Sequence, residues 1–188
     1  MIASAPALGD KISALAYALR SAEIPFAFGG ALALAYYAEP RATVDVDVNV
    51  FVPPDAIDLV ADVLATLGIQ ASEEERRHAR RDGQVRLFWG TTPIDLFFAY
   101  DAFHFHAAGR IRSVPFGNEM IPVLAAEDLL VCKAVFDRRK DWIDIEQMLL
   151  LEAGTLDLDD TRRWITAMVG PDDERTGRFE RAVREVLG

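Results

Sequence analysis

Two aspartates at alternating positions of one segment are the residues of this sequence best suited to chemistry. From Thr43 to Val52, valines alternate with Asp45, Asp47 and Asn49. A period of two is typical of a half-buried strand, so Asp45 and Asp47 would point to the same face. Two neighbouring carboxylates repel each other unless a cation lies between them. Oxygen ligands of this kind suit Mg²⁺ or Mn²⁺.

Two adjacent glycines precede this strand. Gly29 and Gly30 end a short buried strand expected over 24–28, and an alanine- and leucine-rich segment that favours a helix follows at once. Glycines let a ligand approach the backbone, and the N–H groups at a helix start attract phosphate. Each motif is common by itself, since an Asp-x-Asp strand is usually a solvated face. Their order, with Arg41 and Thr43 between them, favours a site for phosphate and metal.

The segment 28–50, FGGALALAYYAEPRATVDVDVNV, resembles the signature of the nucleotidyltransferase superfamily, which has the DNA-polymerase-β-like fold. Its RATVDVD portion is similar to the form found in AbiEii-type toxins and in small antibiotic nucleotidyltransferases. The resemblance implies an α+β fold, with a mixed or antiparallel sheet flanked by helices and a helical C-terminal region. It also implies that Gly29 and Gly30 hold the nucleotide phosphates and that Asp45 and Asp47 bind metal.

Arg41 and Thr43, inside this signature, are expected to contact phosphate or to hold the loop. For Arg41, an ion pair with Glu39 or with an aspartate is the alternative.

The resemblance also implies a third carboxylate from a later strand, and Asp95 is the candidate. It is the lone charge in the apolar segment TPIDLFFAY. A buried carboxylate is unfavourable unless it is paired or bound to metal. The alternative is that Asp95 caps the turn over 91–93. Asp101 and Asp82 are weaker candidates for the third ligand.

A second segment, AAEDLLVCKAVFDRRKDWIDIEQML, is similar to the pattern that follows the catalytic core in the toxin-like branch. There the lysine matching Lys133 is implied to contact the triphosphate; the alternative is that Lys133 reaches from its helix to water. Asp141 and Asp144 match the acidic positions, and they are expected to orient Lys133 or Arg139, or to bind the acceptor. Lys133 and Asp144 would lie about 16 Å apart on an unbroken helix. A contact between them therefore requires a break near 137–140.

The remaining patterns predict a mixed α/β core followed by helices. Helices are expected over 9–21, 31–38 and 53–67, and strands over 84–89 and 94–100 around a turn at 90–93. Residues 101–124 predict a short helix and one or two strand pieces, while His104 and His106 fit a strand face or an amphipathic edge. From Ala126 onward we expect three or four helices. The domain division is a nucleotidyltransferase core over 1–125 and a helical region over 126–188, packed together as a single structural unit.

Composition restricts the partners. The chain has 188 residues, 51% of them hydrophobic, and a formal net charge of -10, which argues against broad nonspecific binding to nucleic acid. Cys132 is the only cysteine, so the chain forms no internal disulfide and no cysteine zinc cluster. With no signal-peptide pattern and no membrane span in the sequence, we expect a cytoplasmic protein.

The expected activity is the Mg²⁺- or Mn²⁺-dependent transfer of a nucleoside monophosphate from an NTP, such as ATP, to an acceptor hydroxyl. Asp45, Asp47, Asp95 and Lys133 are the expected catalytic residues. RNA, above all a tRNA end, is the leading acceptor, and a cognate antitoxin is an expected partner. An aminoglycoside, a lincosamide and a protein hydroxyl are the alternative acceptors.

Two other functional classes fit less well. An inactive binding module would have no need for costly paired carboxylates. A metal-dependent phosphohydrolase would need a histidine-rich site, but His78, His104 and His106 lie far from the aspartate motif in sequence. The basic run from Arg76 to Arg81 could hold an RNA backbone. A solvated segment whose arginines pair with Glu73, Glu74 and Glu75 is the favoured interpretation.

Overall fold

The computed structural model describes residues 6–188, and its contacts divide the chain into two compact units. The first unit comprises the chain up to Gly29 together with Ala42–Val123. The second comprises Gly30–Arg41 and Leu124–Gly188, so it takes a segment from inside the expected core. That the two parts act as a single structural unit stays a prediction.

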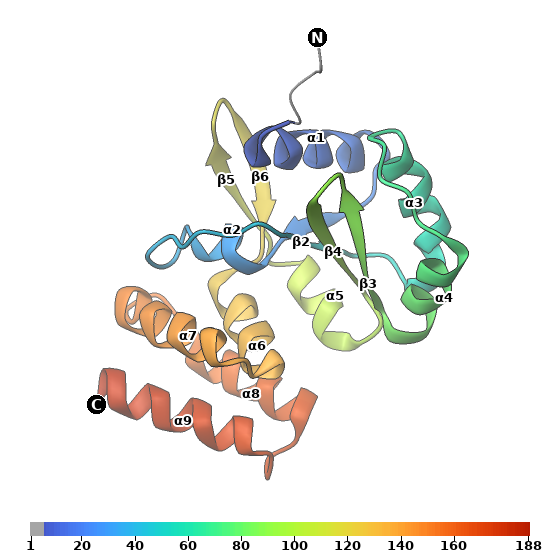
Figure 1. The fold of residues 1–188 in the computed structure, drawn as a ribbon. Helices are drawn as coiled ribbons and strands as arrows, with labels where there is room; N and C mark the ends of the chain where they lie inside the picture. Colours follow the sequence, from blue (N-terminus) through green and yellow to red (C-terminus); the bar gives the residue numbers. More distant parts are fainter. Residues whose placement is uncertain (1–5) are drawn as a thin grey trace. The chain divides into compact units, whose positions relative to one another are not determined.

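A six-stranded mixed sheet, in the order β3-β4-β2-β1-β6-β5, forms the frame of the first unit (Figure 1). Its strands are β1 Phe26–Phe28, β2 Val46–Val50, β3 Gln84–Trp89, β4 Thr92–Phe98, β5 Arg112–Phe116 and β6 Glu119–Val123. Strand β2 runs parallel to β4 and antiparallel to β1, and β1 runs parallel to β6. The expected α+β class with a mixed sheet is confirmed.

The sheet has an apolar face and a polar face around β2 and β4. The valines of β2 lie in register with Ile94, Leu96 and Phe98 of β4, and all of these side chains are buried. Because side chains alternate across a strand, the opposite face of the same two strands carries Asp47 and Asp95. Burial of the apolar face therefore fixes which way these carboxylates point.

Strand β2 is shorter than the expected strand over 43–52. It begins at Val46, so Asp45 lies just before it, and Val44 is 75% exposed rather than buried. Val46 is the first residue of β2 paired with β4, opposite Ile94. The residue before Ile94 is Pro93, which has no N–H to continue the ladder.

Helices of the first unit complete its core. They are α1 Leu8–Ser21, α3 Ile57–Ala65, α4 Glu73–Asp82 and α5 Ala102–Ala108, with a 3₁₀ turn over Pro54–Ala56. Apolar side chains at helical spacing on α1 and α3 are fully or almost fully buried, among them Leu15, Leu19 and Leu64. Helix α4 lies beside β3 (Figure 1).

Helix α5 corrects the interpretation of the two histidines. His104 and His106 lie in a helix, not on a strand face. The Asp101 carboxylate accepts the backbone N–H of His104 and also contacts the His104 ring, with Nδ1–Oδ1 at 2.7 Å. This N-terminal cap starts the helix and outweighs the alternation of aromatic residues and histidines.

The basic run lies on α4 as an ion-paired helix, but its partners differ from those expected. Arg76 and Arg80 both donate to Asp58, and Arg81 donates to Asp82. The arginines lower the pKa of Asp58, chiefly through the hydrogen bond from Arg76. Glu75 instead bonds to Ser72, the residue that caps α4.

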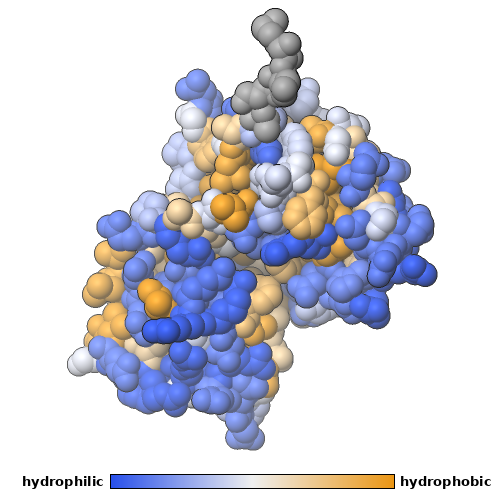
Figure 2. All heavy atoms as spheres, viewed as in Figure 1, coloured by the Kyte–Doolittle hydropathy of each residue, from blue (hydrophilic) through white to orange (hydrophobic). Residues whose placement is uncertain are grey.

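The second unit consists of helices: α2 Gly30–Leu34, α6 Ala126–Phe136, α7 Arg139–Glu152, α8 Leu158–Val169 and α9 Glu174–Leu187. Helix α2 is shorter than the expected 31–38. Helix α6 packs on α7 and α8, and α7 packs on α9. Figure 2 shows hydrophobic patches within a mostly hydrophilic surface of this unit, and Ile143, Leu150 and Leu151 of α7 are exposed. Within residues 6–188, no helix has the length and hydropathy needed to cross a membrane.

Candidate active site

Strands β2 and β4 bring two of the predicted carboxylates together. Asp47 and Asp95 are direct partners in the parallel register, on the polar face of the sheet. Asp45 precedes β2, and its carboxylate accepts a short hydrogen bond from the Thr43 hydroxyl. Thr43 therefore orients Asp45 in this structure.

The two weaker candidates for the third carboxylate bind other groups of the protein. Asp82 ends α4 and pairs with Arg81, while Asp101 caps α5. Of the three candidates, Asp95 alone lies in the same row as Asp47.

Arg86 of β3 forms an ion pair with Asp95. It lies opposite Asp95 in the antiparallel register, with Nε–Oδ1 and Nη2–Oδ2 both at 2.7 Å. Asp95 therefore forms a bidentate ion pair, and it does not cap the turn before it. Arg86, Asp95 and Asp47 form one row across three adjacent strands, which we call the acid row.

The charge of Asp45 also acts on the acid row, through its effect on Arg86. The pKa of Arg86 is raised, first by its hydrogen bond to Asp95 and then by the charge of Asp95. The charges of Asp45 and Asp47 raise it further. All three predicted metal ligands thus lie close enough to act on a single guanidinium.

The donor chemistry of these aspartates fits a hard divalent cation, because all of the donor atoms are carboxylate oxygens. Among residues 6–188, however, no three carboxylate, histidine or cysteine side chains are already arranged as a metal site. Both oxygens of Asp95 bind Arg86.

Gly29 and Gly30 have different backbone roles. The Gly29 N–H donates to the carbonyl of Asp47 at 3.0 Å, so this amide is used by the β1–β2 connection. Gly30 begins α2 with a φ of 52°, a left-handed conformation that favours glycine. Phosphate binding at these positions stays a prediction.

Lys133 and Asp144 form a buried ion pair in the second unit. Lys133 Nζ lies 2.6 Å from Asp144 Oδ2, and each residue is 3% exposed. Helix α6 ends at Phe136, Asp137 is left-handed with a φ of 55°, and α7 begins at Arg139. The expected break near 137–140 is confirmed, and Lys133 does not extend into water.

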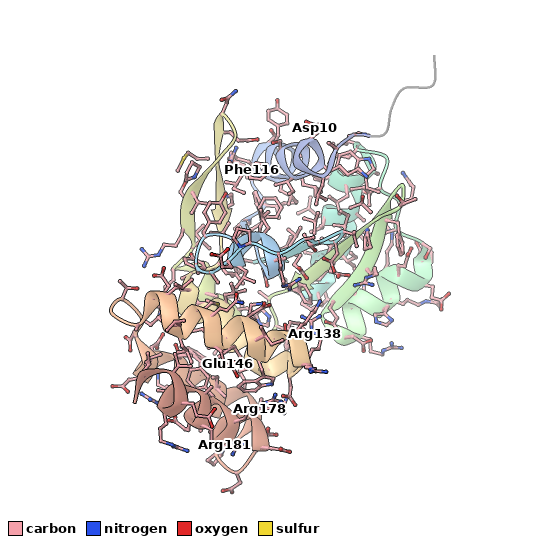
Figure 3. The ribbon with its side chains drawn as sticks, turned by 60° about the vertical axis from the view of Figure 1, so that its left-hand side comes forward. Asp10, Phe116, Arg138, Glu146, Arg178 and Arg181 are labelled. Carbon is pink, nitrogen blue, oxygen red and sulfur yellow. The ribbon has the colours of Figure 1, made fainter. Side chains whose placement is uncertain are left out.

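The Asp144 carboxylate also pairs with Arg41. The two expected partners of Arg41 were Glu39 and an aspartate. Arg41 Nη2 lies 3.3 Å from Asp144 Oδ2, so its partner is an aspartate and not Glu39. Asp141 is fully buried and accepts from Arg138 Nε at 2.6 Å. Figure 3 shows Arg138 at the start of α7. Lys133 Nζ lies 3.9 Å from Asp141 Oδ1, so the lysine faces two acids.

The sequence matches the family model described as nucleotidyl transferase AbiEii toxin, of type IV toxin–antitoxin systems, over residues 13–184. The chain belongs to the AbiEii nucleotidyl transferase toxin family. This AbiEii chain is therefore a transferase of nucleotidyl groups, as the resemblance implied. No curated protein matches its sequence.

Solved structures show the same fold. The solution structure of the antibiotic-resistance factor ANT(2″)-Ia has a TM-score of 0.61 at 16% identity and covers 85% of this AbiEii chain and 89% of its own. The crystal structure of ANT(2″)-Ia with adenylyl-2″-tobramycin has a TM-score of 0.61 at 15% identity, covering 85% and 95%. An antigenic nucleotidyltransferase-like protein from Paracoccidioides brasiliensis has a TM-score of 0.50 at 17% identity, covering 92% of both chains.

Arg86 is the residue of the acid row that the sequence analysis missed. The expected four-residue turn over 90–93 would place Arg86 opposite Phe97. The observed turn contains only Gly90 and Thr91, with Trp89 paired to Thr92. A two-residue turn containing glycine is a known hairpin signal, and it would have given the pairing with Asp95.

Proposed function

We propose that this AbiEii chain transfers a nucleoside monophosphate from an NTP to an acceptor hydroxyl, with Asp45, Asp47 and Asp95 at the reaction centre. The observation that carries the proposal is the register of Asp47 with Asp95 on the polar face, beside Asp45, in a chain of a nucleotidyl transferase family. Three carboxylates in one place are unfavourable without a cation. Mg²⁺ or Mn²⁺ would neutralise the triphosphate and the developing charge when bound there.

In the proposed step, the acceptor oxygen forms a bond to the α-phosphorus of the NTP. The bond from that phosphorus to the oxygen bridging to the β-phosphate breaks, and pyrophosphate leaves. The acceptor proton passes to Asp47 or Asp95, which are the candidate bases. Thr43 holds Asp45 in place through its hydroxyl. The resemblance further implies contacts with the phosphates. These contacts, which remain part of the proposal, would come from Gly29, Gly30, Arg41 and Lys133.

RNA, above all a tRNA end, is the acceptor that we propose, because the family is one of toxins. The basic run on α4 does not support this choice, since Arg76, Arg80 and Arg81 are paired with acids. The fold shared with ANT(2″)-Ia and the net charge of -10 favour a cationic aminoglycoside as the second candidate.

A labelling experiment tests the proposal. The protein is incubated with each of four α-³²P-NTPs and Mg²⁺, with either total tRNA or tobramycin as acceptor. We expect label on tRNA, and a loss of at least about a hundredfold in Asp45→Asn and Asp47→Asn. Asp62→Asn is the matched control, because its carboxylate is 80% exposed on α3 of the same unit.

Label on tobramycin alone would favour the second candidate. Label that persists at the wild-type rate in Asp45→Asn and Asp47→Asn would contradict the proposed centre.

A further inference from the structure

We propose that Arg86 is a built-in competitor of the metal ion: it holds Asp95 in the metal-free protein, and a divalent cation binds the three aspartates only by displacing it. The inference rests on the proposed function, because it assumes that these aspartates bind the metal. It concerns Arg86, a residue that the family signature does not contain.

The first argument is geometric. Arg86, Asp95 and Asp47 occupy one row of three adjacent strands, so their side chains leave the same face of the sheet. Both Asp95 oxygens accept from Arg86 at 2.7 Å. A fork-shaped guanidinium fits a carboxylate in this way and gives one of the stronger ion pairs in proteins. Asp95 is thereby oriented toward β3 through both of its oxygens.

The second argument concerns charge. Arg86 is affected by the charges of Asp95, Asp45 and Asp47, in that order of effect. A single guanidinium therefore partly neutralises the three acids while no metal is bound. A divalent cation carries twice its charge and accepts oxygens from several carboxylates at once. Exchange of Arg86 for the cation is therefore electrostatically favourable.

The third argument is that Arg86 can leave. Its side chain is 55% exposed, whereas that of Asp95 is 14% exposed. A half-exposed guanidinium regains hydration when it moves away, and this offsets part of the lost ion pair. The hairpin keeps its backbone pairing without the ion pair, because β3 and β4 are in register from Gln84–Phe97 to Trp89–Thr92.

Metal binding in the absence of nucleotide gives the first test. Mn²⁺ affinity is measured by electron paramagnetic resonance for the wild type, Arg86→Ala and Arg112→Ala. Arg112 lies on β5, at the opposite edge of the same sheet, so its removal controls for the loss of one positive charge. We expect Arg86→Ala to bind Mn²⁺ about three- to tenfold more tightly than the wild type. Arg112→Ala should bind as the wild type does.

The second test follows Arg86 itself. Its Nε–H signal in a ¹⁵N–¹H spectrum is assigned by its absence from Arg86→Lys. Addition of Mg²⁺ should shift this signal in the wild type, because the bond to Asp95 is replaced by water. The signal should stay in place in an Asp45→Asn/Asp47→Asn variant, in which the ion pair remains and the metal ligands are lost.

Equal Mn²⁺ affinities for the wild type and Arg86→Ala, or an Arg86 signal that ignores saturating Mg²⁺, would overturn the competition. If the wild type still transfers label in that case, the proposed function stands. If no protein binds Mn²⁺ and none transfers label, the competition and the proposed function are both wrong.

Discussion

Among single residues, Asp144 of the second unit is a buried carboxylate that pairs with two positive charges. It is 3% exposed and is bonded to both Lys133 and Arg41. Removing one member of a buried ion pair leaves the other as an uncompensated charge. The result should depend on which member is removed, because Asp144 would keep Arg41 at 3.3 Å whereas Lys133 would keep only the more distant Asp141 at 3.9 Å.

Asp144→Ala should lower the free energy of unfolding by about 3–5 kcal/mol. It leaves buried Lys133 with Asp141 alone, at 3.9 Å. Lys133→Met should cause a clearly smaller loss, because Asp144 keeps Arg41 and the methionine keeps the apolar stem. Urea unfolding is followed by tryptophan fluorescence, since Trp142 and Trp164 lie in the second unit. Equal losses for the two variants would contradict this asymmetry.

Among the elements, α4 depends on the glycine that ends it. Gly83 is left-handed with a φ of 68°, and an added Cβ would lie 2.5 Å from Cδ1 of the Tyr100 ring. Gly83→Ala should therefore lower the free energy of unfolding by about 1–3 kcal/mol through backbone strain and this clash.

Gly68→Ala is the matched control for Gly83. Gly68 follows α3 with a φ of 81°, but an added Cβ would meet no atom within 4 Å. It should show the strain without the clash. A loss in Gly83→Ala no larger than that in Gly68→Ala, measured by thermal or urea unfolding, would show that Tyr100 moves away freely.

Helix α9 has a cap whose contribution depends on pH. Asp173 precedes α9 and accepts hydrogen bonds from the Arg175 guanidinium and, to a smaller effect, from the Arg175 backbone N–H, which lower its pKa from 3.8 to about 2. Because the folded pKa is depressed, the stabilisation is fully present above about pH 4 and is lost as the pH falls through about 2.

The free energy of unfolding of Asp173→Asn is compared with that of the wild type between these pH values. The difference should shrink as the pH falls. Asp172→Asn, one residue away, is the control for the loss of one negative charge. A difference for Asp173→Asn that stays constant with pH would mean that the ionised carboxylate adds nothing to the cap.

For the whole molecule, the proposed function predicts that ligands stabilise the folded chain. NTP with Mg²⁺, at about a hundred times its dissociation constant, should add about 2.7 kcal/mol to the free energy of unfolding. This corresponds to a rise in Tm of roughly 5–11 °C, measured by calorimetry without acceptor. Asp62→Asn should keep the rise, whereas an Asp45→Asn/Asp47→Asn variant should lose it. An equal rise in that variant would place the ligand elsewhere.

The sequence by itself established what depends on local pattern. Alternation of valines with polar residues placed Asp47 on a polar face, because the side-chain period of a strand is two. The helical separation of Lys133 and Asp144 required a break, and Asp137 provides it. These inferences need only neighbouring residues and the geometry of one element, so they could be made before any fold was known.

Contacts between distant segments required the tertiary structure. The pairing of β2 with β4 puts Asp47 beside Asp95, and the length of one turn puts Arg86 opposite Asp95. Residue types do not reveal register, because a small change in a turn moves every pair along the strand. Arg41 finds Asp144 far along the chain for a related reason: the choice among several acids depends on packing. Around His104, alternating residues favoured a strand and the sequence also allowed a short helix. The Asp101 cap on the His104 backbone N–H decided for the helix.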